Sequence, residues 1–384
     1  MRAHFDPGGT PDGLLAALHA LSAEGAIGGL MVLACDANGW QPERLDPILR
    51  GCEIPLFGGI FPQITYQNQN HERGTLLLAL GAAPEIACVR GLSEADADFD
   101  ERVEVATEHW QEPAGATTMV VFVDGLSSRI SALVDGLYAN FGLENNFIGG
   151  GAGSLSFQQR PCILTNAGLL ADVAVLARLP LRSRIGVTHG WEPISEPLKV
   201  TGARGNVVMT LDWEPAFAVY KRMVEAHSGQ EMRAEAFFAL AKSYPFGMTK
   251  LDTEIVVRDP LMVVDGNHLV CVGEVPEGAF VKLLNGTPDT LIAAARKARE
   301  LTMPASAELA GPAQAASASY LFIDCISRVL FLGERIADEL RAVGHDRPVN
   351  GAFTLGEIAN TGDAFLEFYN KTSVFGILFD EAIG

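Results

Sequence analysis

Two segments of the sequence carry the same three polar residue types directly after an apolar run. They are Asp124, Ser127 and Arg129 in the first segment, and Asp324, Ser327 and Arg328 in the second. An aspartate or a serine at a strand-to-helix junction can cap the helix by accepting hydrogen bonds from its first N–H groups. In open α/β sheets, however, ligands bind at the carboxyl ends of strands, where such residues lie. The pattern favours capping for the aspartates and serines, whereas for Arg328 a structural and a ligand-binding role both stay open.

Cys325 is the one residue that suggests catalysis, because it lies between Asp324 and Arg328. A neighbouring cation lowers the pKa of an exposed thiol and makes the thiolate a nucleophile. The sequence contains no GxSxG elbow, no papain-type cysteine context and no kinase signature. We therefore expect a protein that is not an enzyme, with a nucleophilic Cys325 as the alternative.

The histidines and cysteines do not form a metal-binding motif. The eight histidines are spread without HxxH, HExxH or any Cys/His cluster, so a metal site such as a zinc centre is not expected. The six cysteines are scattered and form no CxxC pair. Such usage is typical of reduced cysteines in the cytoplasm, where we expect this protein to be.

Length and charge limit the classes of protein that remain. A chain of 384 residues with 48% hydrophobic residues can fold as two domains with sizeable cores. The net charge of −19 argues against binding to nucleic acid or to an anionic membrane, because both need Lys and Arg to displace counterions. The beginning of the chain does not have the pattern of a signal peptide, and no apolar run approaches the roughly 18 residues that a membrane helix needs.

The segment FIGGGAGSLSF, residues 147–157, places four glycines in five positions. Loops that bind phosphate follow a strand and open a helix, whereas these glycines follow a segment with helical spacing of its apolar residues. We therefore interpret them as a turn after a helix, where glycine takes a positive φ without steric cost. The surplus at Gly150, Gly151 and Gly153 suggests a close approach to a ligand or to another part of the chain.

The elements around these motifs recur. Three times the chain has an apolar strand, an aspartate (Asp36, Asp124 or Asp324), a helix, a turn of small residues and two short strands. Two of these units match over a longer stretch, which suggests duplication. We expect an α/β fold of two similar lobes of mixed β-sheets flanked by helices, built from repeated strand, helix, glycine-turn and hairpin units. The first lobe should span residues 1–184 and the second residues 185–384.

At this point the sequence resembles a known family. The second half carries, in this order, HGWEPI, YPFG, VVRDP, GEVPEGAFV, DCISR, GAFTLGEI and FYNKTSV. This series resembles the C-terminal domain of the FIST family, and LFGGIFPQ and FIGGGAG in the first half resemble the FIST N-terminal domain. The two lobes would then be a FIST N-terminal-like lobe and a FIST C-terminal-like lobe, of the stand-alone bacterial type.

The resemblance implies a sensory function. FIST domains are described as signal-input modules that bind a small ligand, proposed to be amino-acid-like, and pass their state to a partner. Because the two halves use up the chain, we expect the signal to reach a separate protein, such as a histidine kinase. A eukaryotic relative that joins the domain to an F-box leaves a protein-docking module without ligand as the alternative.

One branch of the family is known as haem-containing nitric oxide sensors that act with a histidine kinase, so haem is a possible cofactor. Haem iron needs an axial imidazole or thiolate in an apolar pocket. The candidates are His189, His268 and Cys325, although a lone histidine more often has a structural role than binds a ligand.

For a small ligand we expect polar groups that converge in an apolar cleft of the second lobe. The expected ligand-binding residues are Arg258, Arg328, Glu357, Asn370, Cys325 and Trp191. Arg258 or Arg328 would pair with a ligand carboxylate, and Glu357 or Asn370 would take an ammonium. Arg258 could instead pair with its neighbour Asp259, and Glu357 could satisfy backbone donors near the glycine turn.

Overall fold

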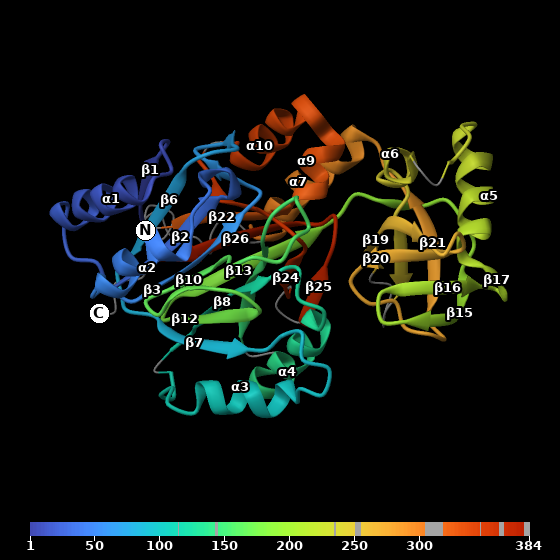
Figure 1. Ribbon diagram of the computed structural model, residues 1–384. Helices are drawn as coiled ribbons and strands as arrows, with labels where there is room; N and C mark the ends of the chain where they lie inside the picture. The colour runs from blue at the N-terminus through green and yellow to red at the C-terminus, as the bar shows by residue number, and fades with distance from the viewer. Residues whose placement is uncertain are drawn as a thin grey trace.

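Figure 1 shows the computed structural model of the chain, a mixed α/β fold with three six-stranded sheets and a separate β-barrel. The structure describes residues 1–113, 115–142, 145–233, 236–249, 255–303, 318–345, 347–360 and 365–379. The three sheets and the helices on them are called the body below. No helix in these described ranges is long and apolar enough to cross a membrane.

Each sheet of the body is built around one parallel pair of strands. The pairs are β2 (Gly29–Cys35) with β3 (Leu56–Phe61), β8 (Thr118–Asp124) with β9 (Asn146–Ala152), and β22 (Ala318–Cys325) with β23 (Asn350–Thr354). The helices between the paired strands are α2 (Pro42–Gly51), α4 (Ile130–Phe141), and α9 (Ile326–Leu332) with α10 (Ile336–Gly344). The strand, helix, strand series that the sequence predicts three times is therefore present.

The strands beside these pairs follow one order in all three sheets. The orders are β1-β6-β2-β3, β7-β12-β8-β9 and β13-β26-β22-β23. The added strands are β1 (Arg2–Asp6), β6 (Thr75–Leu80), β7 (Glu85–Arg90), β12 (Val173–Leu179), β13 (Arg182–Thr188) and β26 (Ser373–Phe379). The sheets thus show three equivalent units, numbered first, second and third by their parallel pairs β2–β3, β8–β9 and β22–β23, and their predicted grouping into two similar lobes is not seen.

The outer helices repeat in the same way. Figure 1 shows these helices on the outside of the body, where α1 (Pro11–Ala23) contacts α2, α3 (Phe99–Thr107) contacts α4, and α7 (Pro288–Leu301) contacts α10. The first residues of α7 illustrate why the sequence begins a helix there. Pro288 occupies the first turn, and the Thr287 hydroxyl accepts a hydrogen bond from the N–H of Thr290, as in a capping box.

Each sheet is completed by a hairpin from another unit. The hairpin β10 (Ile163–Thr165) and β11 (Gly168–Leu170) pairs with β3, β24 (Glu357–Ala359) and β25 (Glu367–Tyr369) pair with β9, and β4 (Gln63–Tyr66) and β5 (Gln69–His71) pair with β23. The second unit therefore gives its hairpin to the first, the third gives to the second, and the first gives to the third. This cyclic exchange joins strands from both sides of residue 184 in two of the sheets.

The glycines of the three predicted small-residue turns lie in strands, so the expectation that they form the turn after each helix is wrong. Gly58 in β3, Gly149 in β9 and Gly351 in β23 hold equivalent places, and a Cβ at any of them would overlap a carbonyl oxygen of the parallel neighbour strand. The turn after α4 is made instead by Gly142, which has a φ of 60°. The small residues are thus needed where the central strands approach one another.

The next glycines of β9 bring another part of the chain close. The N–H of Gly151 donates to the carbonyl oxygen of Gly356 at 2.8 Å, and the Gly151 oxygen accepts from the N–H of Leu355 at 2.8 Å. A Cβ on Gly150 or Gly151 would collide with this turn. The surplus glycines therefore serve a close approach of the third unit to the second.

A closed six-stranded barrel interrupts the third unit between β13 and α7 (Figure 1). Its strands are β15 (Leu198–Arg204), β16 (Val207–Leu211), β18 (Phe246–Thr249), β19 (Ile255–Val264), β20 (His268–Val272) and β21 (Phe280–Asn285). Pairing of β21 with β18 closes the ring. The short strands β14 (Glu192–Pro193) and β17 (Glu214–Pro215) add to β21 and β16, and the helices are α5 (Ala216–Ser228) and α6 (Phe237–Ala241). The barrel has its own apolar core.

Candidate functional site

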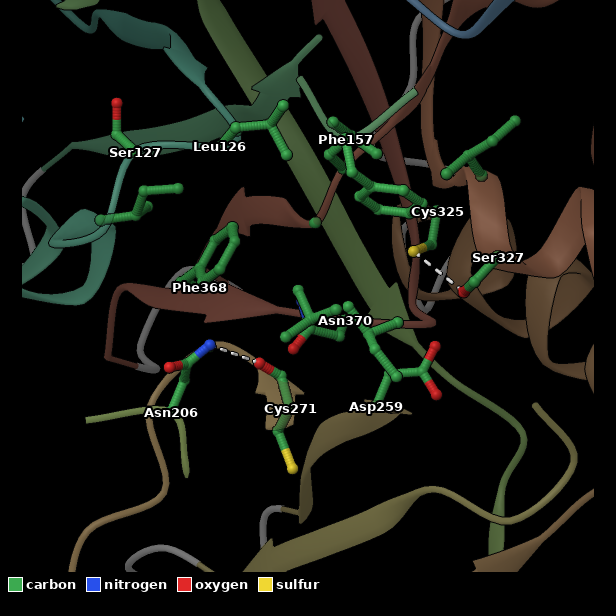
Figure 2. Close-up of a pocket in the computed structure, with 18 of the residues that line it drawn as sticks. Leu126, Ser127, Phe157, Asn206, Asp259, Cys271, Cys325, Ser327, Phe368 and Asn370 are labelled. Carbon is green, nitrogen blue, oxygen red and sulfur yellow. Dashed lines mark hydrogen bonds between the residues drawn. The ribbon is translucent and has the colours of Figure 1, made fainter. Parts of the chain in front are cut away.

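A cavity of about 290 Å³ lies where the second unit, the third unit and the barrel meet (Figure 2). The segments after β8, β9, β22 and β23 line it from the body, and strands β19 and β20 line it from the barrel. Its larger apolar lining residues are Leu126, Ile130, Leu155, Phe157, Phe238, Leu261, Ile326, Leu330, Leu355 and Phe368. The wall is therefore mainly apolar, as in sites for small organic ligands.

Two buried polar side chains in this lining have an oxygen without a partner. Asp259 is 2% exposed and Asn370 is 1% exposed. The Oδ2 atom of Asp259 lies 3.0 Å from Nζ of Lys371, and Nδ2 of Asn370 donates to the Tyr369 carbonyl at 3.0 Å. Neither Oδ1 atom has a hydrogen-bond partner among the described residues. Buried acceptors are normally satisfied, so each of these oxygens has the capacity for a further hydrogen bond.

Lys371 has a constrained backbone conformation and places its ammonium group beside the cavity. It has a φ of 53° in the turn between β25 and β26. Its Nζ donates to the Lys242 carbonyl at 2.9 Å and lies 5.1 Å from the ring centroid of Trp191. Burial raises the pKa of Asp259, and the Lys371 charge opposes that rise. This fully buried ion pair joins the body to the barrel.

Trp191 supports the same turn instead of lining the cavity. Its Nε1–H donates to the carbonyl oxygen of Lys371 at 3.1 Å, and only 2% of its surface is exposed. The indole therefore fixes the lysine from both sides, through its N–H and through its ring.

Arg258 precedes Asp259 in β19 and ties the barrel to the body through backbone oxygens. Its Nε donates to the Glu274 carbonyl at 2.9 Å, and its Nη1 donates to the carbonyls of Val257 at 3.1 Å and Phe368 at 2.9 Å. Burial lowers the pKa of Arg258. The guanidinium does not form the surface pair with Asp259 considered from the sequence, because Asp259 pairs with Lys371.

Arg328 is the centre of a second buried charge cluster. Its Nε lies 3.0 Å from Oδ1 of Asp324, and its Nη2 contacts Glu339. It also donates to the carbonyls of His189 at 2.7 Å and Leu291 at 2.9 Å. All three charged side chains are fully buried. These partners of the Arg328 guanidinium all belong to the third unit, and none of them is a ligand.

Cys325 does line the cavity, close to Ser327 (Figure 2). The Ser327 hydroxyl donates to its Sγ at 3.1 Å. Burial raises the pKa of the Cys325 thiol, with the Glu357 charge adding to the rise. The expected lowering of this pKa by a neighbouring cation is therefore wrong, because desolvation outweighs it, and the thiol stays protonated.

Glu357 lies next to the cavity lining and is satisfied by the protein. Its Oε1 accepts from the Thr354 hydroxyl at 2.9 Å, and its Oε2 accepts from the N–H of Thr372 at 3.2 Å. Burial raises the pKa of Glu357 to about 8. The carboxyl group thus serves a backbone donor near the glycine turn, which is the structural role considered from the sequence.

The histidines proposed as haem ligands do not fit that role. His189 lies on a separate open groove of about 580 Å³, and its Nδ1 accepts the N–H of Trp191 at 2.9 Å. The neutral ring, with its pKa lowered to about 4 mainly by burial, then carries its proton on Nε2, the atom that would bind iron. His268 lies in β20 with Nδ1 3.8 Å from Asp265. Neither histidine lines the apolar cavity.

Sequence reasoning thus identifies two lining residues, Cys325 and Asn370, whereas the other four expected ligand-binding residues lie outside the lining. It misses Asp259 as a cavity residue, and with it the ion pair to Lys371. The available signal was the presence of charged residues inside apolar strands, as in IVVRDP and EFYNKTSVF.

Two protein-family models match the chain. One is described as the FIST N domain and matches residues 29–214, and the other is described as the FIST C domain and matches residues 216–360. A search of curated proteins gives no match. The cavity takes lining residues from both matched regions, such as Leu126 from the first and Asp259 from the second.

Proposed function

Because this chain belongs to the FIST family, whose domains are predicted sensory domains of signalling proteins, we propose that it is a sensory protein for a small ligand. The ligand binds in the cavity between the body and the barrel, and the protein passes its bound state to a separate signalling partner, such as a histidine kinase. The role is binding and not catalysis, since the one candidate nucleophile is a buried, protonated thiol.

The observation that carries this proposal is the pair of buried, unpartnered oxygens on Asp259 and Asn370. Leaving a buried acceptor without a hydrogen bond costs about 1–3 kcal/mol. A donor on a bound molecule removes that cost, and the surrounding apolar wall supplies contact area. The volume of about 290 Å³ suits a small molecule.

The position of the cavity suggests how binding becomes a signal. The cavity is lined by the body on one side and the barrel on the other, and the two are joined there by the Lys371–Asp259 pair and by Arg258. A ligand that contacts both parts binds best to one relative placement of them, and so shifts the population toward it. The partner would recognise that placement.

A thermal-shift screen of small molecules tests the proposal, with two tryptophan variants as controls. Leu330 lines the cavity and is 40% exposed, so Leu330→Trp adds bulk at the cavity. Leu15 is 41% exposed on α1, outside the cavity lining, so Leu15→Trp is the matched control. A ligand should raise the melting temperature of the wild type and of Leu15→Trp but not of Leu330→Trp. Equal stabilisation of all three proteins would place the ligand elsewhere and contradict the proposal.

A further inference from the structure

We infer that the cavity selects a positively charged amine with an apolar body, and that Asp259 is the residue that recognises its ammonium group. The inference rests on the proposed function, because it names the class of ligand for the same cavity. It replaces the expectation of an amino-acid-like ligand whose carboxylate pairs with Arg258 or Arg328.

The charges that line the cavity have one sign. Asp259 and Glu274 are the charged side chains of the described lining, and this lining includes no Lys, Arg or His. The nearest cations already have partners: Arg258 and Arg328 bond to backbone oxygens and carboxylates of the protein, and Lys371 bonds to Oδ2 of Asp259, which leaves Oδ1 of the same carboxylate without a partner. A ligand carboxylate would therefore lose its hydration without gaining a partner, which is strongly unfavourable.

The backbone of the segment after β8 also has no donor left for an anion. The N–H of Gly125 donates to the Ala152 carbonyl at 2.8 Å. The N–H of Leu126 donates to Oδ1 of Asp124 at 3.2 Å, and that of Ser127 donates to the Asp124 carbonyl at 3.0 Å. This segment therefore cannot form an anion-binding nest of free N–H groups.

The buried side-chain atoms of the described lining that have no partner are instead acceptors. A primary ammonium has three donors, and the Oδ1 atoms of Asp259 and Asn370 are two acceptors without partners. The hydrogen bond to a carboxylate is charge-assisted, and the low local polarity strengthens it. The other lining residues suit an aliphatic or aromatic body, because Leu355 and Ile326 form part of the wall together with Phe368, which Figure 2 shows.

Isothermal titration calorimetry on matched compounds tests this selectivity. One series is isopentylamine, leucine and 4-methylpentanoate, and the other is phenethylamine, phenylalanine and 3-phenylpropionate. The amine of each series should bind at least about tenfold more tightly than the amino acid and the acid, because only the amine buries no unpaired carboxylate. Binding of each active compound should be lost in Leu330→Trp.

The possible outcomes separate the two proposals. If an amino acid or an acid binds in the cavity as tightly as its amine, the inference on ligand class is overturned while the sensory proposal stands. If no amine binds, the inference is also overturned. If compounds of every class, in a wider screen, fail to bind, the sensory proposal fails with it.

Variants test the role of Asp259. Asp259→Asn should weaken amine binding at least about tenfold, since it removes a charge-assisted hydrogen bond. Because this change also leaves Lys371 without its counter-charge, Asn370→Ala is the second variant, and it should weaken binding about threefold or more without touching the ion pair. Asp265→Asn is the control, the same chemical change on a side chain that is 83% exposed. Wild-type affinity in Asn370→Ala and in folded Asp259→Asn would overturn the assignment.

Discussion

Buried charged side chains form two clusters, one within the third unit and one between the third unit and the barrel. Arg328 contacts Asp324 and Glu339 within the third unit, and Lys371 contacts Asp259 across to the barrel. Removing charges from water is costly, and a buried ion pair often contributes little net stability over apolar residues. We infer that the role of these ion pairs is to fix the relative positions of the segments they join, since both lie close to the cavity.

Glu357 provides a prediction on pH dependence. Burial raises its pKa to about 8 in the folded protein from an ordinary value of 4.5, so the folded state retains a proton that the unfolded chain releases above about pH 4.5. The free energy of unfolding should therefore fall as the pH rises from 5 to 8, by an amount on the order of 3 kcal/mol. In Glu357→Gln, which resembles the protonated side chain, this part of the fall should be absent.

Urea denaturation at pH 5, 6.5 and 8 measures the effect. Glu334→Gln, on an exposed glutamate, is the control and should follow the wild type at each pH. A constant difference in stability between wild type and Glu357→Gln over this range would show that Glu357 does not titrate there.

The sequence indicates which segments lie near the cavity, but it does not indicate which of their side chains face the cavity. Arg258 and Asp259 are adjacent in a strand, so their side chains point to opposite faces. Which face meets the cavity depends on how the barrel closes and docks against the body, and neither is encoded in local periodicity. The sequence therefore predicts Arg258 as a ligand contact, whereas the structure places Asp259 in the lining.

At the scale of the elements, the three central strands depend on glycine. A Cβ on Gly149 would overlap the carbonyl oxygen of Val121 in the parallel neighbour β8, and both are backbone positions in the middle of a sheet. Gly149→Ala should therefore lower the free energy of unfolding by about 3 kcal/mol or more, as for other overpacked core sites. Gly51→Ala, at the end of α2 with open space around its Cα, should be neutral or stabilising.

Thermal and urea unfolding of the two alanine variants checks this prediction. Similar stabilities for Gly149→Ala and Gly51→Ala would mean that β8 and β9 can separate without cost, and would contradict the packing described here.

The sequence predicts the repeating elements well because each has a local signal. The aspartate after each apolar strand and the apolar spacing of the following helix are visible within some 30 residues. The exchange of hairpins has no local signal, because strand pairing joins segments far apart in the chain. The glycines show the same limit, since a strand glycine and a turn glycine look alike until the neighbouring strand is known.

At the scale of the whole molecule, the barrel is an insertion with adjacent ends. Glu192 pairs with Asn285 where β14 meets β21, so the chain enters and leaves the barrel about 5 Å apart. Replacing residues 193–284 with a short Gly-Ser-Gly linker should therefore leave a folded body with one cooperative thermal transition. The excised protein should no longer be stabilised by amines, because a third of the cavity lining, including Asp259, is gone.

Circular dichroism and thermal unfolding test this excision. The body has three apolar clusters, to which the barrel strands add Val256, Val257 and Leu284, and the barrel has a fourth cluster. Loss of cooperative unfolding in the excised protein would show that the buried contacts at Lys371 and Arg258 make the barrel part of the same folding unit.

The cyclic exchange of hairpins also has a consequence during synthesis on the ribosome. Asn68, in the turn of the β4–β5 hairpin, bonds to Val349 just before β23, and the two residues are 281 positions apart. At about 5–20 residues per second, the first hairpin leaves the ribosome roughly 15–60 s before its partner strand exists. During that time the nascent chain carries a strand edge with nothing to pair with, so early contact with a chaperone would favour a correct third sheet over pairing with another chain.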